Sequence, residues 1–307
     1  MRIAVLADVH GNLPALRAVL GELDRDPVDA IVVLGDVVGG PLVRETLELL
    51  AARREPTRWV RGNCEREAVA IYDGAPVSDD SPGRAAAWSA KALDGRWRYD
   101  LAAWPISLAL DGVCFCHGSP RRDDEIITRA TPDDALLEML ANVSEPLVVG
   151  GHIHQQMVRS LGGTVTYANA GSVGMPYEGR PAAFWMIVDD GTPELRETSY
   201  DLDAAIEELR AAGSPDVDDQ LDGSLVDPTD PDWVAAFFEH GAGRGEDPGR
   251  PANRRLRQLS QTPAEAGQVV IADAEVPVGE QRLQRAERVG VETLRNVAAH
   301  QLERDLG

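Results

Sequence analysis

An apolar run that ends abruptly in polar residues opens the chain, since residues 2–12 read RIAVLADVHGN. Immediately afterwards, apolar residues recur at three- and four-residue steps between Leu13 and Leu23, which predicts a helix with one apolar stripe. Pro14 suits the first turn of that helix, and Asn12 is placed to cap it. A buried strand followed at once by such a helix puts Asp8 and His10 at the carboxyl end of the strand, where α/β sheets carry functional groups.

The same alternation continues through the first half of the chain. Apolar runs at 30–34 and 58–60 enclose a helical pattern at 42–52, so residues 2–60 predict the order β-α-β-α-β. Residues 65–104 are helical in pattern but broken by a turn-rich stretch at 73–83, which predicts two helices around a loop. Short turns such as Asp190-Gly191 predict that the later strands form a meander. Those strands are expected at 112–116, 146–149, 164–168, 183–188 and 194–199.

The character of the chain changes after Tyr200. A helix is expected at 202–212, whereas residues 213–232 hold seven Asp and no Lys or Arg, a composition that predicts a linker. Trp233, Phe237 and Phe238 would share one face of a short docked helix at 232–238. A last helix with a weak apolar stripe is expected at about 280–305. The sequence therefore predicts a main domain at 1–212, and an acidic linker with a helical C-terminal extension at 213–307.

Composition restricts the partners and the location. The 307 residues, 43% of them hydrophobic, suffice for one sizeable core with an appendage. The net charge of −21 repels DNA and anionic membranes, although a small phosphate is still admissible. Three cysteines argue for a reducing compartment. No stretch approaches the roughly 20 apolar residues of a membrane span, and residues 1–8 are too short for a secretory signal. We therefore expect a cytoplasmic protein.

Polar residues of metal-binding type follow the β-like segments throughout the chain. Imidazole, carboxylate and amide oxygen together suit Mn, Fe, Co, Ni or Zn. Such a set is too large for one ion, but two ions about 3.5–4 Å apart that share a carboxylate would use all of it, hold a bridging hydroxide and clamp a phosphoryl group. The sequence therefore predicts two divalent ions and phosphoryl chemistry. The candidate ligands are Asp8, His10, Asp36, Asn63, His117, His152 and His154.

In this order, the blocks around these residues resemble the calcineurin-like metallophosphoesterase superfamily. The matching blocks are Asp8-Val9-His10, Gly35-Asp36, Gly62-Asn63, His117-Gly118 and Gly151-His152-Ile153-His154. His117-Gly118-Ser119-Pro120 and Asn169-Ala170-Gly171-Ser172-Val173-Gly174 bring the chain closer to the compact bacterial and archaeal phosphodiesterase-type branch. The resemblance covers about residues 1–200.

The resemblance implies an α/β fold, a four-layer αββα sandwich with the site at one edge, followed here by the C-terminal extension. It also implies that Asp36 bridges two metal ions, with Mn favoured. The first ion would be held by Asp8, His10 and His154, and the second by Asn63, His117 and His152. The residues expected to take part in catalysis are Asn63, Cys64 and His117.

Cys64 departs from the family pattern. Members with phosphomonoesterase or nuclease activity usually carry His directly after the Asn, where it is thought to protonate the leaving oxygen. A thiol with a pKa near its reference value of about 8.5 is a poorer acid partner at neutral pH. The sequence therefore favours leaving groups that need little protonation, or the use of another acid in place of Cys64. A small apolar filler is the alternative interpretation of Cys64.

Two residues are candidates for substrate binding, each with a structural alternative. Arg121 could clamp a phosphate through forked hydrogen bonds or form a surface salt bridge. Asn12 could cap the helix, donate to a phosphate, or do both. We expect hydrolysis of a phosphodiester or a small phosphate ester or anhydride, with a small phosphorylated molecule as partner. A nuclease of the same fold and a non-catalytic protein-binding scaffold are the alternatives, and the sequence leaves a homo-oligomer open.

Overall fold

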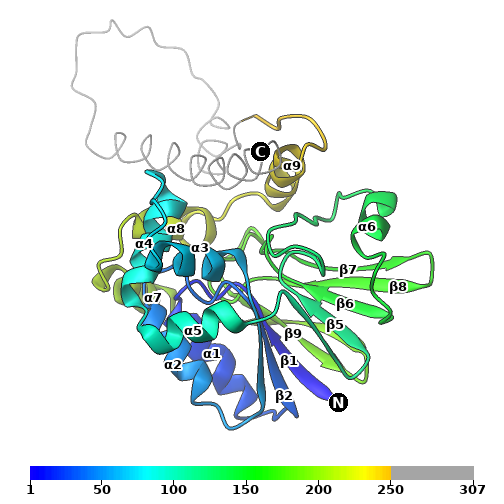
Figure 1. Ribbon diagram of the computed structural model, residues 1–307, viewed down its shortest axis with the longest axis horizontal. Helices are drawn as coiled ribbons and strands as arrows, with labels where there is room; N and C mark the ends of the chain where they lie inside the picture. The colour runs from blue at the N-terminus through cyan, green and yellow to red at the C-terminus, as the bar shows by residue number, and fades with distance from the viewer. Residues whose placement is uncertain (250–307) are drawn as a thin grey trace, which may run out of the picture.

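Two five-stranded sheets lie face to face in the computed structural model, which describes residues 1–249, and helices cover their outer faces (Figure 1). The strand order is β10-β9-β1-β2-β3 in the first sheet and β4-β5-β6-β8-β7 in the second. This is the expected four-layer αββα sandwich of the metallophosphoesterase fold. The first sheet comprises β1 (Arg2–Leu6), β2 (Ala30–Leu34), β3 (Thr57–Val60), β9 (Ala183–Asp189) and β10 (Thr192–Thr198). The second comprises β4 (Ser107–Leu110), β5 (Val113–Cys116), β6 (Leu147–Gly150), β7 (Gln156–Leu161) and β8 (Val165–Ala170).

The first sheet confirms the predicted β-α-β-α-β order. β1 pairs in parallel with β2, and β2 with β3, through the crossover helices α1 (Leu13–Leu23) and α2 (Val43–Ala51). α1 buries its apolar stripe against the outer face of the sheet. Because parallel strands end at the same edge, the loops after β1, β2 and β3 meet there.

Residues 65–104 correct one expectation, because they contain three helices and not two. The helices are α3 (Asn63–Tyr72), α4 (Ser81–Ala92) and α5 (Gly95–Ala103). The break between α4 and α5 is made by Leu93, whose backbone is extended, and by Asp94, whose side chain accepts a hydrogen bond from the Trp97 N–H at 3.0 Å. A helical pattern that continues across such a cap hides the interruption.

The second sheet corrects the predicted meander. Of the strands that were predicted to form the meander, β9 and β10 form a hairpin in the first sheet. β8 lies in the second sheet, where it pairs in parallel with β6. The antiparallel strands β4 and β7, at the two edges of the second sheet, were not predicted. α6 (Asp133–Met139) covers its outer face (Figure 1). Cys114 and Cys116 pack there among apolar residues.

The C-terminal part is more ordered than its composition predicts. After α7 (Leu202–Ala211), the expected linker contains α8 (Val217–Leu221) and a π-helix (Asp222–Val226). Leu221 and Leu225 pack with Leu209 of α7, and further apolar side chains surround them, so a small apolar cluster orders an acidic segment. The surrounding residues are Leu42, Leu202, Ile206 and Val217. A wholly irregular linker at 213–232 is therefore wrong.

The predicted docked helix is confirmed as α9 (Pro231–Gly241), which buries Val234, Phe237 and Phe238 on the outer face of the second sheet. The division between 212 and 213 stays a prediction, and the helix expected at 280–305 lies outside the described residues. No helix within residues 1–249 is long and apolar enough to cross a membrane.

Candidate metal centre

The predicted ligands come together at one edge of the sandwich. Each lies just after a strand, because the carboxyl ends of β1, β2 and β3 in one sheet and of β5 and β6 in the other meet there. Asp8 and His10 follow β1, Asp36 follows β2, Asn63 begins α3 after β3, His117 follows β5, and His152 and His154 follow β6. Asp8, Asp36, His117 and all three other imidazoles are buried.

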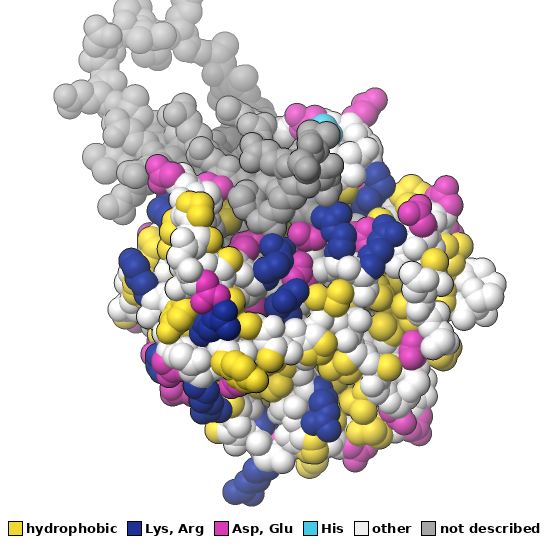
Figure 2. All heavy atoms as spheres, viewed as in Figure 1, with side chains coloured by type: hydrophobic (Ala, Val, Ile, Leu, Met, Phe, Trp, Pro, Cys, Tyr) yellow, Lys and Arg dark blue, Asp and Glu magenta, His cyan; other side chains and the backbone are white. Residues whose placement is uncertain are grey.

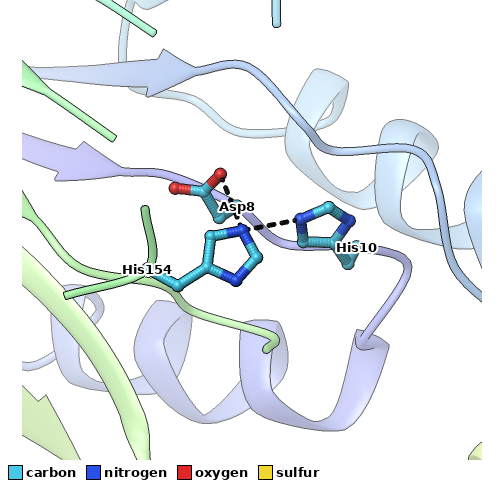
Figure 3. Close-up of side chains that lie close together, drawn as sticks. All are labelled: Asp8, His10 and His154. Carbon is cyan, nitrogen blue, oxygen red and sulfur yellow. Dashed lines mark hydrogen bonds and ion pairs between the residues drawn. The ribbon is translucent and has the colours of Figure 1, made fainter. Parts of the chain in front are cut away.

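One group consists of Asp8, His10 and His154 (Figure 3). The Nε2 atom of His154 lies 3.3 Å from Asp8 Oδ1 and 3.2 Å from the Nε2 atom of His10. Asp8 and His10 come from the loop after β1, and His154 reaches them from the second sheet (Figure 3). These residues are the three that the resemblance assigns to the first metal ion.

A second group consists of Asp36, His117 and His152, whose ligand atoms lie within 4.8 Å of one another. His117 Nε2 is 3.3 Å from Asp36 Oδ2 and 3.9 Å from Asp8 Oδ1. Asp36 Oδ2 is also 3.8 Å from His10 Nε2. Asp36 therefore lies between the two groups, where a shared carboxylate is expected.

Unpaired buried atoms show that this donor set fits divalent cations. Asp8 Oδ1, Asn63 Oδ1 and His117 Nε2 are buried without a hydrogen-bond partner among the described residues. Leaving buried polar atoms unpaired costs free energy, which coordination of a cation would offset. The Nδ1 atoms of His117 and His154 lie 2.5 Å from the Leu34 carbonyl oxygen and 2.6 Å from that of Met175. These contacts turn both Nε2 atoms toward the cluster, as the outer contacts of metal-binding histidines do.

Burial and the neighbouring charges set the protonation of the ligands, and His117 differs from the others. Burial, helped by a neighbouring imidazole, lowers the pKa of His10 and of His152 to about 4, so both rings are neutral at neutral pH. Burial alone would raise the pKa of Asp8, but His154 and His117 lower it. Burial disfavours a charged His117, yet the facing carboxylates raise its pKa to about 10. A divalent cation would replace that proton, because metal binding and protonation compete.

Backbone strain is concentrated in the ligands. Several of them adopt the left-handed conformation, which costs a non-glycine residue on the order of 1–3 kcal/mol and persists where the surrounding structure enforces it. The values of φ are 54° at Asp8, 45° at His10, 48° at Asp36, 71° at His152 and 55° at His154. A glycine is required beside them at Gly62, since a Cβ atom there would lie 2.1 Å from Asp36 Oδ1.

Glu65 anchors the Asp36 loop, a role that the motif comparison missed. Its fully buried carboxylate accepts hydrogen bonds from the N–H groups of Asp36 and Gly62 on Oε2 and of Val37 and Val38 on Oε1, at 2.8–3.2 Å. Burial and the nearby Asp36 raise the pKa of Glu65 to about 7, whereas the N–H donors favour the carboxylate form. The signal was its place at the third position of α3, where a Glu reaches back to the N-cap.

Cys64 also contacts Asp36. Its N–H donates to Asp36 Oδ1 at 2.9 Å, and its Sγ lies 3.2 Å from Asp36 Oδ2. Burial, followed by the charge of Asp36, raises the pKa of the Cys64 thiol well above its ordinary value. The thiol is thus protonated at neutral pH and holds its proton more tightly than a free cysteine.

The two candidate substrate contacts also make the structural contacts considered above. Asn12 caps α1 by accepting a hydrogen bond from the Ala15 N–H at 3.1 Å, while its amide donates to the Gly174 carbonyl at 2.8 Å. Its amide also lies 3.4 Å from the Tyr200 hydroxyl, and a contact of Asn12 with a phosphate stays a prediction. Arg121 forms ion pairs with Glu125 and Glu138, which is the surface pairing considered above.

A pocket opens from the cluster, with an empty volume of about 720 Å³. His10, Asp36, Asn63, Cys64, His152 and His154 form its base. The walls of the pocket come from α4, α8, α9 and the segment that follows β8. These elements are far apart in the sequence, so the sequence did not indicate that they form one pocket.

Comparison with known proteins identifies the family. Residues 1–190 match the calcineurin-like phosphoesterase superfamily domain, and the chain belongs to this superfamily. A metallophosphoesterase from Sphaerobacter thermophilus is similar in structure, with 26% identity, a TM-score of 0.58, and coverage of 70% of this chain and 96% of that one. Membership supports a hydrolase that acts on phosphate esters.

Two archaeal proteins are also similar. The uncharacterised protein MJ0912 of Methanocaldococcus jannaschii is 28% identical over 228 residues, which cover 67% of this chain and 91% of that protein. The hypothetical protein PH1004 of Pyrococcus horikoshii shares the fold, with a TM-score of 0.61 at 21% identity over 70% of this chain and 94% of its own.

Proposed function

We propose that the protein hydrolyses a phosphodiester, or a small phosphate ester or anhydride, with two divalent cations that share Asp36, Mn being favoured. The observation that carries the proposal is that two buried groups of His and Asp side chains adjoin each other, with Asp36 between their imidazoles. The buried ligand atoms Asp8 Oδ1, Asn63 Oδ1 and His117 Nε2 have no hydrogen-bond partner among the described residues. Divalent cations in such a site supply an activated water and neutralise charge on the phosphoryl group.

Residues around the metal centre position the ligands and restrict the leaving group of the substrate. The ligand side chains are held in place before any cation binds, by the carbonyl contacts of His117 and His154 and by the hydrogen bonds of Glu65 to the Asp36 loop. The protonated thiol of Cys64 is poorly suited to protonate a leaving oxygen, because its pKa is raised. This supports substrates whose leaving group departs as a stable anion.

The surface charge argues against a nuclease. Figure 2 shows basic and acidic side chains next to each other on the face it draws. In the loop between β5 and α6, Arg121 pairs with Glu125, and Asp123 and Asp124 pair with Arg66 of α3. Paired arginines and a net charge of −21 give a polyanion little attraction.

The retained ligand cluster argues against a non-catalytic scaffold. A protein that works by binding partners has no need of strained, buried metal ligands such as Asp8 and His152. We also propose a cytoplasmic location, which the three free cysteines support.

The proposal is tested with the purified full-length protein, stripped of metal and reloaded with Mn, Ni, Zn or nothing. Bis(4-nitrophenyl) phosphate should be hydrolysed with metal, faster than 4-nitrophenyl phosphate, and not without metal. Asn63→Ala should abolish the activity, while Asn142→Ala, at an exposed position, should leave it unchanged. Full activity in the stripped protein or in Asn63→Ala would refute the proposal.

A further inference from the structure

The walls of the pocket are mostly apolar. Above the ligand cluster, the lining is formed by Pro82, Ala85 and Ala86 of α4, by Met175 and Tyr177 after β8, and by Phe238 of α9. The empty volume of about 720 Å³ includes space that is open to solvent, so the pocket is a cleft above the ligands. A compact group attached to a phosphate held at the base would therefore contact these walls.

The wall from the C-terminal part is fixed to the metal ligands. The Tyr177 ring stacks on the His154 ring at 4.8 Å and 17°, and Phe238 lies 6.3 Å from Tyr177. Next to Phe238, the buried Glu239 accepts hydrogen bonds from Thr128 at 2.7 Å and Thr131 at 2.5 Å. These hydrogen bonds hold α9 on the second-sheet side of the protein, and they fix the position of Phe238 in the pocket wall.

The lining offers no cation to a second anionic group. None of the described residues that line the pocket is Lys or Arg. A nucleotide with further phosphates, or a dianionic tail, would find no cation there to compensate the loss of its hydration. An apolar or aromatic group would instead gain from leaving water.

We infer that the substrate is a monoanionic phosphodiester with a compact apolar or aromatic group, which this pocket binds between α4 and α9. The inference rests on the proposed function and names its substrate class. Ala85 and Ala86 set the space available, because any larger side chain there would occupy it. Phe238 supplies an aromatic contact from beyond the region that matches the family.

Binding without turnover tests this inference. The ligands are diphenylphosphinate and dimethylphosphinate, which are both monoanions without an ester bond, titrated calorimetrically into the full-length Mn-loaded protein. Diphenylphosphinate should bind about tenfold more tightly or better, because its rings are buried. Ala86→Leu should remove this preference by filling the pocket, and Ala85→Val should reduce it. Ala87→Leu, on the same helix but outside the pocket lining, should keep it.

The outcomes separate the inference from the proposed function. Equal dissociation constants for the two phosphinates in the unmodified protein would overturn the inference even if bis(4-nitrophenyl) phosphate is hydrolysed. An unchanged preference in folded Ala86→Leu, checked by circular dichroism, would also overturn it. Failure to hydrolyse any phosphate ester with any metal would instead overturn the proposed function, whatever the phosphinates do.

Discussion

Replacing Glu65 by Gln should loosen the Asp36 loop, although it changes one atom of the side chain. The carboxylate accepts two N–H groups on each oxygen, and a Gln must put its own NH2 group in place of one oxygen. Two backbone N–H groups then lose their acceptor in a site with no exposure. Each lost hydrogen bond to a charged group costs about 1.5–3 kcal/mol. Because the pKa of Glu65 is about 7, the free energy of unfolding should fall by about 3–6 kcal/mol when measured above that pH, where the carboxylate is ionised.

The same substitution should weaken metal binding, because Asp36 is a ligand and its N–H is one of those released. Losing a contact that orients a ligand typically costs about 10–100-fold in metal affinity. Urea unfolding of the metal-free protein measures the stability, and Mn titration calorimetry measures the affinity. Glu45→Gln, on the exposed side of α2, is the control and should change stability by no more than about 0.5 kcal/mol. A loss below about 1 kcal/mol for Glu65→Gln with unchanged Mn affinity would refute the anchoring role.

Other predictions concern the thiol, the acid stability and the metal. Cys64→His should raise hydrolysis of an alkyl monoester such as propyl phosphate by about tenfold or more, because imidazolium can protonate the leaving oxygen; an unchanged rate of phosphate release contradicts this. Glu239→Gln should lower the free energy of unfolding by about 2 kcal/mol, since it breaks a buried network with Arg244, Thr128 and Thr131. Burial opposes ionisation of Glu239, but Arg244 and the threonines lower its pKa below the ordinary 4.5, so its stabilisation is present above that pH and lost as pH falls further. The variant should accordingly lose less stability on acidification below pH 4.5 than the unmodified protein does. Melting temperatures that fall equally with pH in the two proteins would contradict the assignment. Removing metal with a chelator should lower the melting temperature, and added Mn should restore it, because the cations bind only the folded state.

Local patterns were enough to predict the elements that carry the ligands. The helix at 13–23 and the strand at 30–34 have the predicted bounds, since a full apolar stripe and a run buried on both faces leave few alternatives. The short edge strands β4 and β7 were missed because they have little buried pattern. The helix α8 was missed because its own sequence is acidic. It is stabilised by a contact between Leu221 and Leu209 of α7, which local sequence does not reveal.

The candidate site shows the same limit. Its ligand residues follow strands and could be identified from spacing, but their geometry could not, because it depends on how two face-to-face sheets bring the carboxyl ends of their strands together. The strained conformations of Asp8 and Asp36, and the stack from His154 through Tyr177 to Phe238, are tertiary features. Arg121 illustrates the converse case, because a residue with suitable chemistry is used by neighbouring carboxylates.

Crystals of the full-length protein grown with Mn would test the metal centre most directly, through the anomalous signal of the ion. Our account predicts two anomalous peaks about 3.5–4 Å apart, with the Asp36 carboxylate between them. The first should be bound by Asp8, His10 and His154, and the second by Asn63, His117 and His152. A single peak, or peaks that Asp36 does not contact, would contradict it.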